Sequence, residues 1–142
     1  GFCRVIGTPV VARRAFPGFV GSYMKAQSDN DREVAARAVA RAKTRDGARI
    51  AASLWRSFAT PEHDLRDLAG ELRAPTLIVW GAKDTALQSR VGQATHEAIA
   101  NSRLVVLDTA HVVFSSDPKA FLSEALPFIA SVAARQMATP SS

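Results

Sequence analysis

Two short runs of apolar, β-prone residues stand out in the second half of the chain. Residues 76–80 read TLIVW and residues 104–107 read LVVL, and neither run alternates with polar residues. A continuous apolar run is typical of a strand that is covered on both faces, so both are predicted to be buried strands. Residues 90–100 lie between them and show helical spacing, with Asn101 expected as a left-handed cap. The expected inward-facing positions of this helix are Val91, Ala94, Ala98 and Ile99.

The first half of the chain is predicted to be largely helical. Asn30, with Glu33 three residues later, predicts a capping-box start for a long helical region that Gly47 ends. An apolar residue at every fourth position predicts the buried stripe of a second helix: Ile50, Leu54 and Phe58, with Trp55 beside them. Thr60 and Pro61, a cap followed by a first-turn proline, predict a third helix to about Leu72. The aromatic residues and Met24 are interpreted as the core of this region: Phe16, Phe19, Tyr23, Met24, Trp55 and Phe58.

Both ends of the chain carry further elements. Cys3–Ile6 is a candidate buried strand, which Gly7, Thr8 and Pro9 close. A last helix is expected to begin at Asp117 and Pro118, and Pro127 is expected to kink or restart it. Its apolar side comprises Phe121, Leu122, Ala125, Leu126 and Ile129.

Composition narrows the class of protein. The chain has 142 residues, 47% of them hydrophobic and 22% charged, which is typical of a globular domain or part of one. Its longest apolar stretches are about half the roughly 18 residues of a membrane span. Cys3 is the single cysteine, so an internal disulfide, a zinc cluster and a CxxC redox pair are all excluded, and a cytoplasmic location is predicted. Because the chain opens on Gly1 and an apolar run, it is interpreted as a fragment.

The excess positive charge lies in the first half of the chain. Residues 1–74 hold 13 Lys and Arg against 8 Asp and Glu, whereas residues 75–142 hold 5 of each. Arg37, Arg41, Arg45 and Arg49 are four residues apart, which would place them on one helical face. A solvated helix face is the favoured interpretation, and an anion- or nucleic-acid-binding face is the alternative.

A carboxylate and a histidine follow the two predicted strands. Asp84 ends the stretch PTLIVWGAKD, and His111 follows the second strand in LDTAHVVF. Functional groups in parallel sheets gather beyond the carboxyl ends of the strands, so the two side chains are expected within hydrogen-bond reach. A carboxylate on one ring nitrogen fixes the tautomer and stabilises the imidazolium, which leaves the other nitrogen to act as a base. His63 and His96 have no such setting and are expected at the surface.

The stretch from Asp64 to Ile129 resembles the C-terminal half of the α/β-hydrolase superfamily. DLRDLAGELRAPTLIVWGAKD is similar to the segment that leads through the penultimate core strand to the catalytic acid. RLVVLDTAHVVFSSDPKAF is similar to the last strand, the catalytic-histidine loop and the closing helix. RVIGTP resembles the sixth strand and its exit loop. The resemblance implies that Asp84 and His111 are catalytic, and that no cofactor or metal is needed.

The nucleophile of that family lies on a G-x-S-x-G elbow, and this chain contains no such elbow. Ser22 has Val20 and Met24 at positions that require small residues. Cys3 is followed by Val5 and Pro9, which replace the second glycine and block the helix, and it is interpreted as a buried strand residue. The nucleophile and oxyanion hole are therefore expected upstream of Gly1.

The sequence thus predicts the C-terminal part of an α/β-hydrolase fold, with about three parallel strands, flanking helices and a helical cap. The predicted divisions are the sixth strand and its exit loop (1–9), the cap (10–72), the hydrolase core (73–135) and a flexible tail (136–142). The predicted function is hydrolysis of a small apolar ester, lactone or related molecule with water as second substrate, and with neither nucleic acid nor membrane as partner. A non-catalytic hydrolase-fold binding protein is the alternative, and the reaction subtype stays open among esterase, haloperoxidase-like, carbon–carbon hydrolase, dehalogenase and epoxide hydrolase.

Overall fold

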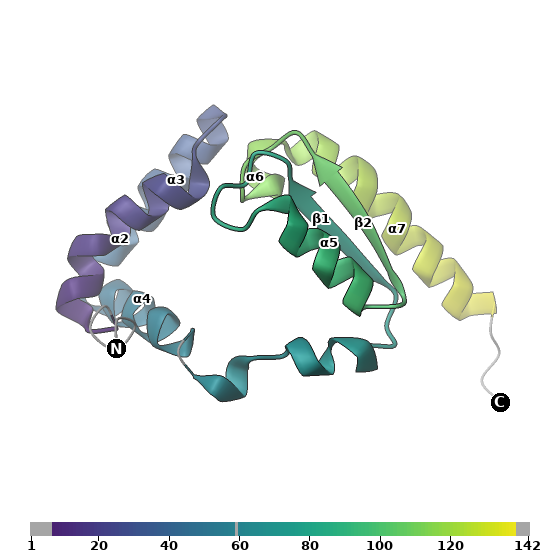
Figure 1. The fold of residues 1–142 in the computed structure, drawn as a ribbon. Coiled ribbons are helices and arrows are strands. Elements are labelled where there is room, and N and C mark those ends of the chain that lie inside the picture. The colour runs from purple at the N-terminus through teal and green to yellow at the C-terminus, as the bar shows by residue number, and fades with distance from the viewer. Residues whose placement is uncertain (1–6, 59, 139–142) are drawn as a thin grey trace. The chain divides into compact units, whose positions relative to one another are not determined.

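The computed structural model describes residues 7–58 and 60–138, which form two separate units (Figure 1). The helical unit lies within Gly1–Asp67, and the α/β unit lies within Leu68–Ser142. The candidate strand Cys3–Ile6 and residues 139–142 lie outside the described residues. None of the described helices is long and apolar enough to cross a membrane.

Within its described residues the helical unit contains three α-helices: α2 (Pro9–Met24), α3 (Asp29–Lys43) and α4 (Arg45–Ser57). Its core is small and consists largely of alanine: Ala12, Ala51, Ala52 and Trp55, with Phe16 and Phe19 packed against them. The Trp55 ring lies edge-on to Phe19, with ring centroids 5.7 Å apart. Because alanine lets helix backbones approach closely, one tryptophan and two phenylalanines fill the remaining space. The prediction that the aromatic residues form the core is confirmed for these three, whereas Phe58 is 67% exposed.

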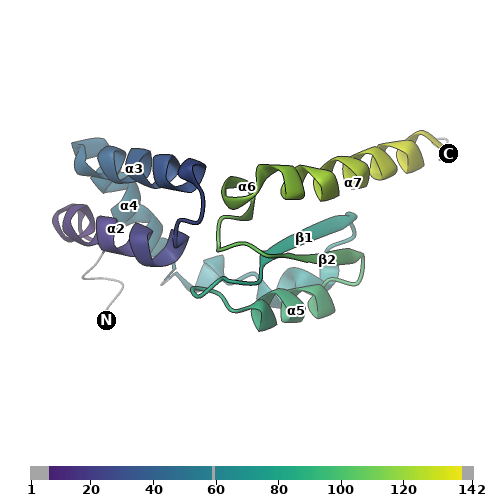
Figure 2. The ribbon, with the colours of Figure 1, turned by 90° about the horizontal axis from the view of Figure 1, so that it is seen from above.

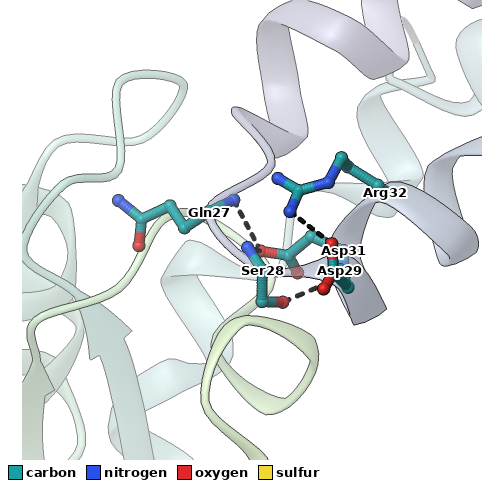
Figure 3. A network of polar contacts seen from close by, with 5 residues as sticks. All are labelled: Gln27, Ser28, Asp29, Asp31 and Arg32. Atoms are coloured by element: carbon teal, nitrogen blue, oxygen red, sulfur yellow. Dashed lines mark hydrogen bonds and ion pairs between the residues drawn. The ribbon is translucent and has the colours of Figure 1, made fainter.

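Helix α3 begins with a capping box two residues before the predicted one (Figure 3). The Ser28 hydroxyl accepts a hydrogen bond from the Asp31 N–H at 3.0 Å. The Asp31 Oδ2 atom in return accepts from the N–H groups of Ser28 and Gln27, at 3.3 and 3.0 Å. Asp31 is fully buried, and its carboxylate satisfies N–H groups at the start of the helix.

The break between α3 and α4 falls at Thr44 rather than at Gly47. The Thr44 hydroxyl donates to the Arg41 carbonyl at 2.8 Å and accepts from the Gly47 N–H at 3.1 Å, so one residue ends a helix and starts the next. Gly47 lies inside α4, where a Cβ would come within 1.9 Å of the Arg41 oxygen. This break also puts Arg37 and Arg41 on a different helix from Arg45 and Arg49, so the predicted continuous arginine face is wrong.

Two other predictions for this region are wrong. The Ile50, Leu54 and Phe58 stripe is exposed, because α4 packs through its alanine and tryptophan face. The expected third helix is instead two 3₁₀ helices, Pro61–His63 and Arg66–Glu71. Between these helices the Asp64 Oδ1 atom accepts from the Arg66 N–H at 3.2 Å, a local turn that competes with a continuous helix.

The α/β unit confirms the predicted strand–helix–strand order. It contains β1 (Thr76–Gly81), α5 (Ser89–Ala98), β2 (Ser102–Leu107), a short α6 (Val113–Ser116) and the long α7 (Pro118–Ala138). Strands β1 and β2 are parallel, with Thr76 opposite Ser102 and Gly81 opposite Leu107. Helices α5 and α7 lie on opposite faces of this sheet (Figure 2).

Several details of this unit differ from prediction. Only Ile78 and Gly81 are buried in β1 and no residue is buried in β2, because two helices cover a two-stranded sheet only in part. Helix α5 ends on Ile99 in an extended conformation, and among described non-glycine residues Lys25 alone has a positive φ, so Asn101 is no left-handed cap. Gly92 is buried within the helix and Ile99 directly after it, whereas Val91, Ala94 and Ala98 are exposed.

Helix α7 begins where predicted. The Asp117 Oδ1 atom accepts from the Ala120 N–H at 3.0 Å, and Pro118 is the first helical residue. Contrary to the expected restart, the helix runs through Pro127. Leu122, Leu126 and Ile129 are exposed, because they lie on a different side of the helix from the partly buried residues. The residues on the packed side are Phe121, Glu124, Ala125, Phe128 and Val132.

Candidate active site

The loops that follow β1 and β2 leave the same edge of the sheet side by side. Gly81 and Leu107, the last residues of the two strands, are register partners. The pairing continues beyond them, because the Ala82 N–H donates to the Leu107 carbonyl at 2.7 Å and the Lys83 N–H to the Thr109 carbonyl at 2.9 Å. The two loops are thus tied together up to the residue before Asp84.

Gly81 allows the loop that follows β2, which carries His111 and is called the histidine loop below, to cross the end of β1. A Cβ on Gly81 would lie 2.2 Å from the Ala110 oxygen and 2.5 Å from the Thr109 oxygen, far inside van der Waals contact. Only a residue without a side chain permits this approach. The glycine of the Gly-x-x-Asp pattern therefore serves the position of the histidine loop.

Asp84 is almost completely buried and its carboxylate is fully engaged. The Oδ1 atom accepts from the N–H groups of Ala86 and Leu87, at 2.8 and 2.9 Å. The Oδ2 atom lies 2.7 Å from Nδ1 of His111. An ionised carboxylate only accepts hydrogen bonds, so Nδ1 of His111 carries the proton in this contact. The expected contact between the two side chains is present.

Opposing effects set the pKa of Asp84. Burial of the carboxyl group raises the pKa, but hydrogen bonds from the Leu87 N–H, the His111 ring and the Ala86 N–H together outweigh it. The pKa of Asp84 consequently lies below its ordinary value. The carboxyl group of Asp84 is therefore the ionised partner of the pair at neutral pH.

His111 extends from a loop whose other residues are anchored. Its side chain is 23% exposed, whereas the Asp84 side chain is 3% exposed. Thr109 and Ala110 before it, and Val113 after it, are buried. A histidine that is held at Nδ1 by a buried carboxylate, and partly open to solvent, has the arrangement of a general base.

Two hydrogen-bonded contacts near the Asp84–His111 pair were not predicted from the sequence. The Lys83 Nζ atom donates to Asp108 Oδ2 at 2.8 Å and joins the same two loops at the surface. The Trp80 indole N–H donates to the Leu87 carbonyl at 2.8 Å. The first pair has a weak sequence signal, since Lys83 and Asp108 directly follow paired strands, but the second joins a side chain to the backbone and leaves no pattern.

The other candidate residues have different hydrogen-bond partners. His63 is exposed, with Nδ1 3.1 Å from the Ser57 carbonyl oxygen. His96 is partly buried, and its Nδ1 lies 2.8 Å from the Ser102 hydroxyl. Ser22 lies within α2 and donates to the Phe19 carbonyl, so it is no strand-to-helix elbow. Cys3 lies outside the described residues.

No group of three or more His, Cys, Asp or Glu side chains that could hold a metal ion is found within residues 7–58 and 60–138.

Comparison with known proteins gives two kinds of match, although no protein-family model matches the chain. Over 75 residues, or 52% of its length, it is 35% identical to the pimeloyl-[acyl-carrier protein] methyl ester esterase of Neisseria meningitidis serogroup A / serotype 4A, covering 24% of that protein. It is 38% identical over 64 residues to the protein of the same name from serogroup B / serotype 15, covering 44% of the chain and 25% of that protein. The chain thus spans about a quarter of the length of these relatives.

A solved structure is also similar. It is a hydrolase from Pseudomonas aeruginosa PA01, with a TM-score of 0.60 and 26% sequence identity. The match covers 79% of this chain and 42% of the hydrolase. The parallel β1–α5–β2 unit and these likenesses place the chain in the α/β-hydrolase fold superfamily, of whose fold it holds a part.

Proposed function

We propose that the chain supplies the acid and the base of an α/β-hydrolase that cleaves a small, largely apolar ester, lactone or related substrate with water. The observation that carries the proposal is the 2.7 Å contact between His111 Nδ1 and the buried Asp84 carboxylate. The name of the Neisseria relatives supports ester hydrolysis as the reaction class, and that of the Pseudomonas structure supports hydrolysis in general. The nucleophile and oxyanion hole belong to sequence outside these 142 residues, and residues 10–72 are assigned to the cap region.

In the proposed mechanism, His111 moves protons and Asp84 orients His111. Because Asp84 holds Nδ1–H, proton transfer runs through Nε2, which takes the proton of the attacking hydroxyl. The imidazolium that forms is stabilised by the Asp84 carboxylate. Nε2 then returns the proton to the leaving alcohol, and the cycle repeats with water as the attacking group.

Fusing the chain behind the part of the Pseudomonas hydrolase that it does not match would test this proposal. This joined enzyme should hydrolyse activated esters and react with a serine-directed phosphonate probe, whereas the 142-residue chain alone should do neither. His111→Ala should abolish labelling, and His63→Ala, which alters an exposed histidine, should not.

Undiminished labelling of the His111→Ala variant would contradict the assignment of the base. A joined enzyme that folds cooperatively but neither labels nor hydrolyses esters would favour the alternative, a hydrolase-fold binding protein without catalysis.

A further inference from the structure

Trp80 occupies the position in β1 directly before Gly81, and its ring lies against helix α5. A Cβ added to Gly92 of α5 would come within 2.7 Å of the Trp80 Cδ2 atom and 2.9 Å of its Cε3 atom. Gly92 is the buried residue of α5. The indole ring therefore packs directly against the backbone of α5. This packing fixes the direction of the indole N–H group.

That N–H group reaches the far end of the acid loop, residues 82–88. The Trp80 Nε1 atom donates to the Leu87 carbonyl at 2.8 Å, a contact across seven residues. Leu87 is 40% exposed, so the packing of its side chain does little to hold this end of the loop. The indole contact joins this far end of the loop to the strand.

Leu87 also holds the carboxylate. Its N–H group donates to Asp84 Oδ1 at 2.9 Å, and the other carboxylate oxygen lies 2.7 Å from His111 Nδ1. One residue thus receives a hydrogen bond from Trp80 and donates one to Asp84. The contacts form a continuous series from Trp80 through Leu87 and Asp84 to His111.

We propose that Trp80 is a positioning residue, whose indole N–H fixes the acid loop so that the Asp84 carboxylate stays aligned with His111. Trp80 touches neither reacting group and acts through Leu87. The inference rests on the proposed function for its consequence in catalysis, but the geometric claim concerns the pair alone.

Two variants separate the hydrogen bond from the packing of the ring. Trp80→Phe keeps an aromatic ring against Gly92 and removes the donor. Replacement of Trp80 by 3-benzothienylalanine, in which sulfur replaces the indole N–H, removes the donor with almost no change of shape. The second variant keeps the test decisive if the smaller phenylalanine ring disturbs folding.

Nuclear magnetic resonance of the 142-residue chain provides the readout. In both variants the Ala86 and Leu87 amides, which donate to Asp84, should exchange with solvent about tenfold faster, the change expected for loss of one hydrogen bond. The His111 Nδ1–H signal should weaken through faster exchange. In the joined enzyme, kcat should fall about three- to tenfold with KM unchanged, because alignment of the base and not substrate binding is affected.

Lys83→Gln is the matched control, because Lys83 joins the same two loops through a surface ion pair. It should leave both the amide exchange and the Nδ1–H signal at wild-type values. The proposal is overturned if the benzothienylalanine variant also keeps wild-type exchange and an unchanged Nδ1–H signal. If these signals change as expected while His111→Ala leaves turnover intact, the proposed function fails and the positioning role of Trp80 stands.

Discussion

The helical unit and the α/β unit use buried polar side chains in different ways. In the helical unit, buried Asp31 binds N–H groups three and four residues away and so serves the start of its own helix. In the α/β unit, buried Asp84 binds the ring of His111, which is 27 residues away in the sequence. A local contact stabilises one element, whereas a contact between two loops creates a site. Of the two buried carboxylates, Asp84 is thus the one that fits the proposed chemistry at the edge of the sheet.

The largest expected effect is a difference in kcat between substitutions of the two buried carboxylates, Asp84 and Asp31. In the joined enzyme, Asp84→Asn should lower kcat by about 10⁴, because the amide favours the wrong tautomer of His111. Asp31→Asn, the matched change in the helical unit, should leave kcat unchanged and cost on the order of 1 kcal/mol of unfolding free energy. Steady-state kinetics and denaturant unfolding of both variants measure this contrast. Equal losses of kcat would contradict it.

Removal of the central side chain of the helical unit should have the largest effect on stability. Trp55 is 4% exposed and contacts Phe16 and Phe19. Trp55→Ala should destabilise that unit by about 3–5 kcal/mol, because the alanine and phenylalanine side chains of its core leave a cavity in place of the indole. Hydrogen exchange should rise across α2 and α4. The His111 Nδ1–H signal should stay unchanged, and its loss would mean that the site depends on the helical core.

The same glycine substitution should have opposite effects in the two units. Gly81→Ala should destabilise the α/β unit by about 1–3 kcal/mol and displace the histidine loop, because the new methyl group would overlap the Ala110 and Thr109 oxygens. Gly18→Ala in α2 meets open space and should stabilise its helix by up to about 1 kcal/mol. Thermal unfolding of the two variants provides the comparison. Unchanged stability in Gly81→Ala would show that the loop moves freely.

A pH dependence should arise from Asp84. Its pKa in the folded protein lies below its ordinary value, so the folded state binds fewer protons than the unfolded state at acid pH. The resulting stabilisation is fully present above the unfolded pKa of about 3.9 and is lost as the pH falls through the lowered folded pKa. Denaturant unfolding of wild type and Asp84→Asn between neutral and acid pH should therefore converge at low pH. A constant difference would contradict the expectation.

The smallest expected effect concerns the ion pair on the surface of the site. Lys83 and Asp108 have side chains that are 51% and 81% exposed, so solvent screens their attraction. Lys83→Gln should cost less than about 1 kcal/mol, and the cost should vanish at high salt. Unfolding measured at low and high salt checks this value. A loss above about 2 kcal/mol would assign the ion pair a structural role.

The sequence contained enough information for the strand–helix–strand unit and for the contact between Asp84 and His111. Both depend on signals that survive in one chain: apolar runs predict buried strands, and parallel strands bring the following loops to one edge. The start of α7 at Asp117 and Pro118 could also be predicted, because a cap and a first-turn proline act locally. The resemblance to α/β-hydrolases agrees with the fold that the comparisons support.

Other features could not be predicted because they depend on which surfaces meet. Helix α2 was not predicted, because it contains three residues that are poor helix formers in isolation: Pro17, Gly18 and Gly21. The stripe of Ile50, Leu54 and Phe58 had the right period but does not lie on the packed face. Periodicity identifies a face and not its partner, and here the alanine face allowed closer packing.

The central claim is that His111 acts as a general base whose orientation Asp84 maintains. Its most direct test is ester hydrolysis by the joined enzyme carrying His111→Ala, measured without and with added imidazole. Turnover should fall by several orders of magnitude, and imidazole should restore part of it by occupying the space of the missing ring. Turnover that stays near the wild-type rate in the His111→Ala variant, and does not respond to imidazole, would contradict the claim.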